Sequence, residues 1–320
     1  MLTSPITLYL TEGLALTGRS RNSYARAASG PNPTMVRVHR GVYADRTEWA
    51  RLPAWKRHLT IACASTMAAP PGSERVLVRE SAAVVQGIPM VGSLPRSAQV
   101  AIPGSLRGRV SRSTTTHSAP ADLDVRSLRG TLTTSPAQTV VDLACTRSFR
   151  SGLVSADAVL ATGAASLEEM VEIVERHPGR PGIRRARQVL RYADGNSESP
   201  AESLSRAVMI EHRLPLPVIQ YEVRETDGVL VARVDFYWPE LRRAGEIDGK
   251  IKFEEPLAGP DPASRAAALV QRDSRLAHAL GHPSIHWTWD DAYHEEEMLR
   301  RLALEGIEPQ PHLPEPPNRI

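Results

Sequence analysis

Residues 233–253 read RVDFYWPELRRAGEIDGKIKF, and this stretch decides the fold expected for the carboxy-terminal part of the chain. A half-apolar run ends in Asp235 and meets a proline-containing turn at residues 238–240. A second run, residues 244–252, carries three charged side chains at alternate positions: Glu246, Asp248 and Lys250. Alternate side chains of a strand share one face, so this run predicts a charged strand face. A hairpin would bring Asp235 beside that face.

The lysines single out the same stretch. The chain has 39 Lys plus Arg residues, yet its only lysines are Lys56, Lys250 and Lys252. A compact, titratable ammonium differs physically from a guanidinium fork, so the placement of two rare lysines here favours a chemical site. Grouped carboxylates resist ionising together, and a bound divalent cation removes that cost. The alternative is a surface hairpin whose charges only face water.

The order of Asp, turn, Glu-x-Asp-Gly and a basic residue resembles the Vsr-like branch of the PD-(D/E)xK nucleases. The most similar arrangement is that of actinobacterial proteins that join this domain to an AbiEi-antitoxin-like amino-terminal region. The resemblance covers the carboxy-terminal third well and the middle more loosely. It implies a restriction-endonuclease-like α/β domain that hydrolyses phosphodiester bonds with Mg²⁺ or Mn²⁺. Asp235, Glu246 and Asp248 would hold the metal, and Lys250 would orient or deprotonate the attacking water.

Several positions depart from the common motif or allow two explanations. Lysine usually lies two residues after the Glu, whereas here Asp248 takes that position and Lys250 follows. Arg272 matches a basic position of the family and is expected to contact nucleic acid, as is Lys252. Glu202 follows Ser199 by three residues, which completes a capping box at a helix start. The resemblance also implies that Glu202 points toward the metal-binding carboxylates, and both roles are compatible.

Two basic segments outside this stretch are candidates for contact with DNA. Residues 35–43 alternate apolar and basic side chains, as a half-buried strand pair does. In the resembling proteins such a segment closes a small winged helix, which implies that Arg37, His39 and Arg40 follow a phosphate backbone. An ordinary protected edge strand explains the same charges. Residues 182–191 predict a basic helix that faces either phosphates or water, with these candidate contacts: Arg184, Arg185 and Arg187.

Length and composition bound the remaining possibilities. The chain has 320 residues, 41% of them hydrophobic and 23% charged, which is long enough for two or three domains. We expect a degenerate winged-helix-like region (1–70), an α+β middle region (71–195), a nuclease-like domain with a central mixed sheet (196–305) and a disordered tail (306–320). The polar segment 194–197 is the expected linker. The fold class is therefore α/β, of the α+β kind.

Charge, cysteine content and hydropathy limit the binding partners and the cellular compartment to be expected. The net charge of +3 permits nucleic-acid binding without demanding it. Two cysteines form no metal or disulfide pattern, and no apolar run approaches the roughly 18 residues of a membrane span, so a cytoplasmic protein is expected.

Two functional hypotheses from different classes follow. The first is a DNA-binding, Mg²⁺-dependent endonuclease. The second is a non-enzymatic, AbiEi-like antitoxin or transcriptional regulator that uses the nuclease fold only for binding and has a toxin protein as its partner. The retained Asp235, Glu246 and Lys250 favour the first hypothesis, and the altered Glu-x-Asp order favours the second.

Overall fold

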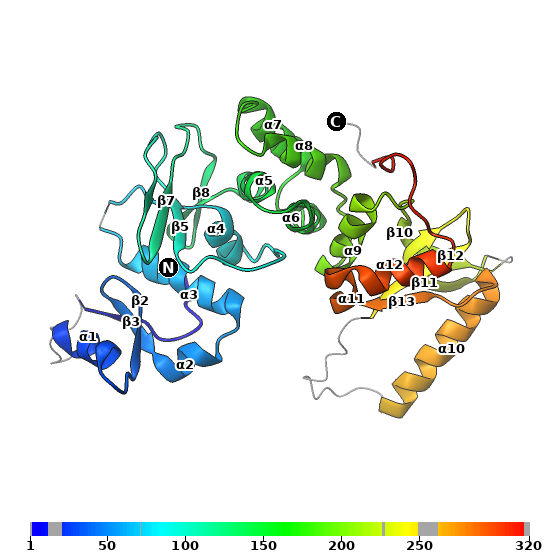
Figure 1. Ribbon diagram of the computed structural model, residues 1–320, viewed down its shortest axis with the longest axis horizontal. Coiled ribbons are helices and arrows are strands. Elements are labelled where there is room, and N and C mark those ends of the chain that lie inside the picture. The colour runs from blue at the N-terminus through cyan, green and yellow to red at the C-terminus, as the bar shows by residue number, and fades with distance from the viewer. Residues whose placement is uncertain (1, 12–20, 71, 226–227, 249–261, 317–320) are drawn as a thin grey trace. The chain divides into compact units, whose positions relative to one another are not determined.

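The computed structural model describes residues 2–11, 21–70, 72–225, 228–248 and 262–316 (Figure 1). These residues form two compact units. Unit 1 comprises Met1–Ser155 and Gly163–Arg187, and unit 2 comprises Ala156–Thr162 and Gln188–Ile320. Lys250 and Lys252 lie outside the described residues.

Unit 1 begins with a small antiparallel sheet in the order β1-β3-β2. Its strands are β1 (Tyr9–Leu10), β2 (Met35–His39) and β3 (Val42–Asp45), and its helices are α1 (Arg21–Ser29), α2 (Arg46–Arg51) and α3 (Ala54–Met67). The alternation over residues 35–43 correctly predicts the β2–β3 hairpin, whose register pairs Arg37 with Tyr43. Gly41 adopts a φ of 77° in the turn, a left-handed conformation that glycine reaches without steric cost.

A six-stranded mixed sheet of order β6-β7-β5-β4-β9-β8 completes unit 1. Its strands are β4 (Val76–Leu77), β5 (Ala98–Ala101), β6 (Arg109–Val110), β7 (Thr114–His117), β8 (Val125–Leu128) and β9 (Thr131–Thr134). The helices that follow or interrupt them are α4 (Arg79–Gln86), α5 (Pro136–Thr146) and α7 (Leu167–Arg176). Two further helices, α6 (Phe149–Ala161) and α8 (Ile183–Tyr192), begin in unit 1 and end in residues of unit 2. A capping box formed by Ser166 and Glu169 begins α7.

Unit 2 is built on a four-stranded mixed sheet of order β10-β11-β12-β13. Its strands are β10 (Val218–Arg224), β11 (Leu230–Trp238), β12 (Arg243–Asp248) and β13 (Ile285–Thr288). Its helices are α9 (Pro200–Glu211), α10 (Pro262–Leu280), α11 (Trp289–His294) and α12 (Glu296–Leu304). The first three strands are antiparallel, and β12 and β13 are parallel. The expected α+β class and the expected central mixed sheet are confirmed.

Strand alternation in the β11–β12 hairpin sends side chains to two different cores. Tyr237 and Ala244 pack with Leu276 and Leu280 of α10. The next residues along the two strands, Phe236 and Gly245, lie against the ring of Trp287, whose indole N–H donates to Ser205 of α9. Glu246 has the parity of Ala244, and Arg272 of α10 reaches it. Asp235 follows Val234, which also packs with Leu276 and Leu280 of α10, so simple alternation does not hold through this part of β11.

The boundaries of the units differ from those expected from the sequence. Residues before and after residue 70 share one core, in which Val42 and Ile61 pack with Leu77 and Val100, so the chain does not divide at residues 70–71. The polar segment 194–197 is not a linker between units. It belongs to unit 2, because the Asp194 N–H donates to Asp157 at 2.8 Å and Ser197 is buried.

The carboxy-terminal segment is ordered where the structure describes it. The expected disorder of residues 306–320 does not hold for residues 306–316. Ile307 is buried, the Gln310 N–H donates to the Arg213 carbonyl at 2.8 Å, and the Tyr192 hydroxyl donates to the Pro314 carbonyl at 2.8 Å. Proline here limits regular structure but leaves the backbone carbonyls free to accept hydrogen bonds.

Candidate functional site

Asp235 and Glu246 are brought together by the β11–β12 hairpin. The ladder pairs Phe236 with Gly245, and one residue further out the Asp235 carboxylate accepts the Ile247 backbone N–H at 2.9 Å. The side chain therefore takes the place of a ladder acceptor at this point. This bond fixes Asp235 next to Glu246, as the sequence predicted.

Glu246 makes one strong contact and leaves one oxygen without a partner. Its Oε2 accepts from Arg272 Nη1 of α10 at 2.8 Å, and this bond is the main reason that the pKa of Arg272 is raised. Arg272 also donates to the Arg233 carbonyl at 3.0 Å. Glu246 Oε1 is buried and has no hydrogen-bond partner among the described residues. A buried carboxylate oxygen in that state carries an uncompensated desolvation cost.

Glu202 joins this group from α9, although capping also occupies it. Its carboxylate accepts from the Ser199 hydroxyl at 2.7 Å and from the Glu198 N–H at 3.0 Å, while Ser199 Oγ accepts the Glu202 N–H. Gln220 of β10 donates its amide to Glu202 at 2.9 Å. The expected capping box is present in part: Ser199 caps the helix, but the Glu202 carboxylate accepts the Glu198 N–H in place of the Ser199 N–H. Gln220 connects Glu202 to β10, the strand paired with the one that carries Asp235.

Gln220 is a site residue that the sequence analysis missed. The β10–β11 register pairs Ile219 with Phe236 and Tyr221 with Val234, which places Gln220 opposite Asp235. Gln220 has a φ of 54°, a left-handed conformation that costs a residue other than glycine roughly 1–3 kcal/mol. Such strain is concentrated at functional sites. The residue pattern of β10 gives no indication of this left-handed conformation.

Burial and mutual repulsion raise the pKa values of two carboxyls in the cluster. The pKa of Asp235 is raised chiefly by burial and also by the charge of Glu246, against the hydrogen bonds from Ile247 and Gln220. The pKa of Glu202 is likewise raised by burial, with a smaller effect of Asp235. Both shifts have the sign expected for carboxylates that need a cation.

Asp248 stands apart from the other carboxylates. Its side chain is exposed and meets His286 Nδ1 of β13 at 3.0 Å. Among the described residues, no three His, Cys, Asp or Glu side chains come together as a metal site. The expected set of three ligands is therefore reduced to Asp235 and Glu246. This pair fits a divalent cation, because Glu246 Oε1 lacks any other partner among the described residues and Asp235 lies beside it.

The amino-terminal arginines line a concave surface in unit 1. Arg37 and Arg40 are exposed, and they lie in a groove of about 1040 Å³, which we call the arginine groove. Five further arginines line it: Arg46, Arg75, Arg96, Arg109 and Arg112. No described Asp or Glu lines the groove or pairs with these seven side chains. The sequence does not show these five as one group, because they come from separate segments of the chain.

Three of the expected phosphate contacts have partners within the protein instead. His39 is buried, its Nε2 meets the Thr114 hydroxyl at 2.9 Å, and burial lowers its pKa, so the ring is neutral and enclosed. Arg185 donates to the Ala144 and Cys145 carbonyls at the end of α5. Arg187 pairs with Glu175 at 3.3 Å. Of the three candidates in the basic helix, only Arg184 is exposed, whereas Arg185 and Arg187 are half-buried.

Comparison with known proteins adds relatives without an assigned role. No family model matches the chain. The chain is 40% identical over 124 residues to the uncharacterized proteins MT2308 and Rv2248 of Mycobacterium tuberculosis strains CDC 1551 and H37Rv. That match covers 39% of this chain and 45% of each relative, so less than half of the relatives' length is spanned. A crystal structure of the RV2827C protein from Mycobacterium tuberculosis aligns with 62% of this chain and 75% of its own, at 16% identity and a TM-score of 0.37.

The structure also bears on membrane association. No helix within the described ranges combines the length and the apolar character needed to cross a bilayer.

Proposed function

We propose that unit 2 hydrolyses phosphodiester bonds of DNA with a divalent cation, Mg²⁺ or Mn²⁺, held by Asp235 and Glu246. The observation that carries the proposal is the buried Oε1 of Glu246, which has no partner among the described residues and belongs to a carboxylate beside Asp235. Two adjacent, partly buried carboxylates reduce the free energy of unfolding, so stability alone gives no reason to keep them. A cation site explains that cost.

Each residue of the cluster has a task in this proposal. A bound divalent cation supplies charge for the phosphoryl oxygens and lowers the pKa of a coordinated water. Asp235 and Glu246 hold the cation, and the Ile247 N–H keeps Asp235 in position. Arg272, which reaches Glu246 from α10, is placed to contact a phosphate. Lys250 remains the proposed base or water-orienting group, although it lies outside the described residues.

The arginine groove supports the DNA-binding part of the proposal. A phosphate backbone is held mainly by Lys and Arg side chains, whose contacts release condensed counterions. Seven arginines without a described carboxylate among them provide such a surface. Arg37 and Arg40 contribute to it from the β2–β3 hairpin.

Calorimetric titration with MnCl₂ tests the cation site. We expect the wild-type chain to bind Mn²⁺ and Glu246→Gln to lose this binding while keeping its fold. The matched control is Glu305→Gln, because Glu305 also pairs with a single arginine of unit 2, Arg243, at 2.7 Å. Glu305→Gln should bind Mn²⁺ like the wild type. Equal Mn²⁺ affinity in Glu246→Gln and the wild type would refute the site.

A second function, DNA binding without catalysis, is favoured by a different observation. Arg272 already neutralises Glu246 Oε2, and the described residues hold no third ligand next to Asp235 and Glu246. In a regulator or antitoxin, the ion pair between Arg272 and Glu246 would be enough to balance the buried charge, and no metal would be needed. Incubation of a labelled DNA duplex with the protein and Mn²⁺ separates the two functions. Cleavage that Glu246→Gln abolishes supports the nuclease, whereas salt-sensitive binding without cleavage supports the regulator.

A further inference from the structure

Unit 1 contains a second cavity, distinct from the arginine groove and remote in sequence from the carboxylate cluster. It has a volume of about 910 Å³, within the range of small-molecule sites. The end of β7, the β4–α4 junction, helix α5 and the segment between α7 and α8 line it. One wall is apolar and belongs to a small core, with these residues: Val78, Ala101, Ala119 and Leu123.

The charged lining of this cavity is strongly cationic. Its described residues include four arginines and a single carboxylate: Arg79, Arg176, Arg180, Arg185 and Asp142. Asp142 is buried and bound by Arg180 at 2.8 Å and by the Gln138 amide at 2.7 Å. Its charge is therefore committed to Arg180. The cavity keeps an excess of positive charge that no lining group offsets.

Arg79 is the cation without a partner. Its side chain is half-buried, and no described residue accepts a hydrogen bond from its guanidinium or pairs with it. Burial lowers its pKa, which is the expected cost of a charge removed from water. Its backbone has a φ of 50° at the first residue of α4, a conformation that strains any residue with a Cβ. Both costs are unexplained by the fold alone.

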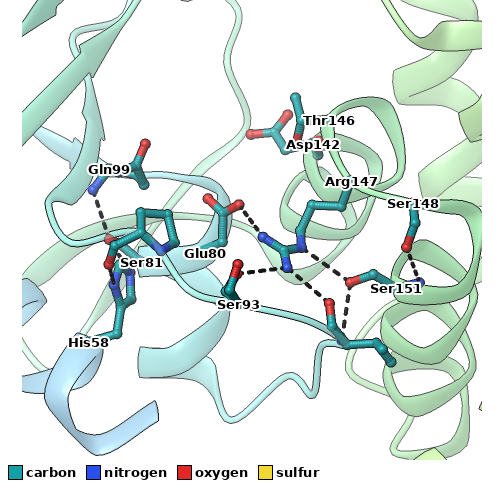
Figure 2. A network of polar contacts seen from close by, with 12 residues as sticks. His58, Glu80, Ser81, Ser93, Gln99, Asp142, Thr146, Arg147, Ser148 and Ser151 are labelled. Carbon is teal, nitrogen blue, oxygen red and sulfur yellow. Dashed lines mark hydrogen bonds and ion pairs between the residues drawn. The ribbon is translucent and has the colours of Figure 1, made fainter. Parts of the chain in front are cut away.

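The adjacent carboxylate, Glu80, is held away from Arg79 by another arginine. Figure 2 shows Arg147 directed at Glu80, with Nη1 and Oε1 2.9 Å apart. Arg147 also donates to the Val91 and Ser93 carbonyls at 2.9 Å each and to Ser151 at 3.3 Å. This network fixes the start of α4 with Glu80 already neutralised. The Arg79 guanidinium therefore remains available to bind a ligand in the cavity.

A neutral histidine adds a hydrogen-bond acceptor to the lining. His117 Nε2 lies 2.7 Å from Gln99 Oε1, and the Gln99 amide nitrogen donates to Ser97. The Gln99 oxygen is therefore the acceptor, so His117 carries its proton on Nε2 and leaves Nδ1 bare. Burial and the charge of Arg79 lower the pKa of His117 to about 4. At neutral pH the ring adds no charge and can accept a hydrogen bond.

We propose that this cavity binds a small organic phosphate monoester, with its phosphate on Arg79 and its organic part against the apolar wall. A phosphate dianion suits this lining better than a monoanionic carboxylate does, because Arg79 has no described partner, Arg176 lies 3.9 Å from the exposed Asp122, and Arg185 donates to backbone carbonyls. Guanidinium groups bind phosphate oxygens in a bidentate manner. The proposal does not depend on the carboxylate cluster of unit 2. It assigns a ligand to a part of the chain that the proposed hydrolysis leaves unused.

Calorimetry on the full chain with phenyl phosphate tests the proposal, with benzoate as the carboxylate probe. We expect binding of phenyl phosphate to be stronger than binding of benzoate. Arg79→Gly should weaken it on the order of tenfold or more, the effect of losing a charge-assisted hydrogen bond. Arg129→Gly is the matched control, because Arg129 also has a φ of 50° but is exposed in the β8–β9 turn. It should bind phenyl phosphate like the wild type.

Thermal unfolding without ligand provides a second readout. Glycine accepts a left-handed φ, so Arg79→Gly should melt no lower than the wild type although it loses the ligand. Arg79→Asn, which also tolerates this conformation, should behave in the same way. Unchanged phenyl phosphate affinity in both variants would overturn the proposal. So would equal affinity for benzoate, or protection by a DNA duplex with none by phenyl phosphate.

Discussion

The Asp235 carboxylate accepts the backbone N–H of Ile247 at 2.9 Å, twelve positions along the chain, and this bond joins the two strands that carry the carboxylates. It continues the β11–β12 pairing by means of a side chain, one step beyond the Phe236–Gly245 pair. The position of Asp235 is therefore part of the fold. Its charge is a separate matter, because a neutral acceptor of the same shape would make the same bond.

Substitutions at Asp235 should separate these two roles. Asp235→Asn keeps an oxygen for the Ile247 N–H, so we expect stability equal to or above that of the wild type and loss of Mn²⁺ binding. Asp235→Ala leaves a backbone donor without its partner and should cost a further 1–3 kcal/mol or so. Urea unfolding and calorimetric Mn²⁺ titration measure the two effects. Retained Mn²⁺ affinity in Asp235→Asn would contradict the proposed site.

Arg272→Gln should make the protein depend on a divalent cation. Arg272 compensates Glu246 at 2.8 Å, and its loss leaves Glu246 beside Asp235 without a counter-charge. We expect the metal-free protein to lose about 1–3 kcal/mol and to recover most of it in millimolar Mn²⁺. Arg275→Gln is the control, because its pair with Glu225 is exposed and 3.5 Å long and should contribute little. Equal Mn²⁺ stabilisation of wild type and Arg272→Gln would argue against this account.

Acid should release the cation at a pH above the ordinary range of an aspartate. The pKa of Asp235 is raised by burial and by Glu246, so protons compete with Mn²⁺ earlier than at an exposed carboxylate. In the metal-free protein, the free energy of unfolding depends on pH in the opposite direction from Mn²⁺ binding. The folded state then binds more protons than the unfolded state, so this group's stabilising contribution is greatest at low pH and is lost as pH rises through the folded pKa.

Gln220→Leu sharpens that pH test. The Gln220 amide lowers the pKa of both Asp235 and Glu202 by hydrogen bonding. Its removal should move the pH midpoint of Mn²⁺ binding upward. Gln271→Leu, at an exposed position of α10, should leave the midpoint unchanged. An unshifted midpoint in Gln220→Leu would show that Gln220 does not act on the carboxylates.

The sequence predicts those parts of the site that a local pattern encodes. Alternation and the turn correctly predict the hairpin that pairs Asp235 with Glu246, and the Ser199–Glu202 spacing predicts the cap. The sequence did not predict that Arg272 would bind Glu246. This contact depends on how α10 packs against the sheet, and no local sequence pattern specifies that packing. Gln220 was missed for a related reason. Its left-handed backbone is imposed by the sheet around it rather than by its own preference.

Charge patterns were less informative than strand patterns. His39 has the spacing of a phosphate-facing residue but lies at the strand end that packs inward against Thr114. The arginine groove draws on residues from 37 to 112, so its charge density exists only after folding. The winged-helix segment expected before β2 includes residues 12–20, which lie outside the described residues.

Gly245→Ala should damage the hairpin from its other face. A Cβ at Gly245 would lie 2.6 and 2.8 Å from two ring atoms of Trp287 and 3.2 Å from Trp238, closer than packed atoms allow. Neither indole can move freely, since both are buried and hydrogen-bonded. We expect a loss of about 1–3 kcal/mol in urea unfolding, together with weaker Mn²⁺ binding. Gly179→Ala, with no atom within 4 Å of its added Cβ, should be neutral.

The arginine groove makes a prediction about salt. If it holds a DNA backbone, removing arginines should weaken binding to all sequences alike and should flatten the dependence of log K on log salt concentration, by about 0.9 for each lost phosphate contact. We expect this of the double variant Arg109→Gln, Arg112→Gln, measured by fluorescence anisotropy at several NaCl concentrations. The control is Arg126→Gln, Arg129→Gln, which removes the same charge at β8, the opposite edge of the same sheet from β6. Because general electrostatic attraction would be reduced equally in both variants, equal salt slopes would rule out the groove as the contact surface.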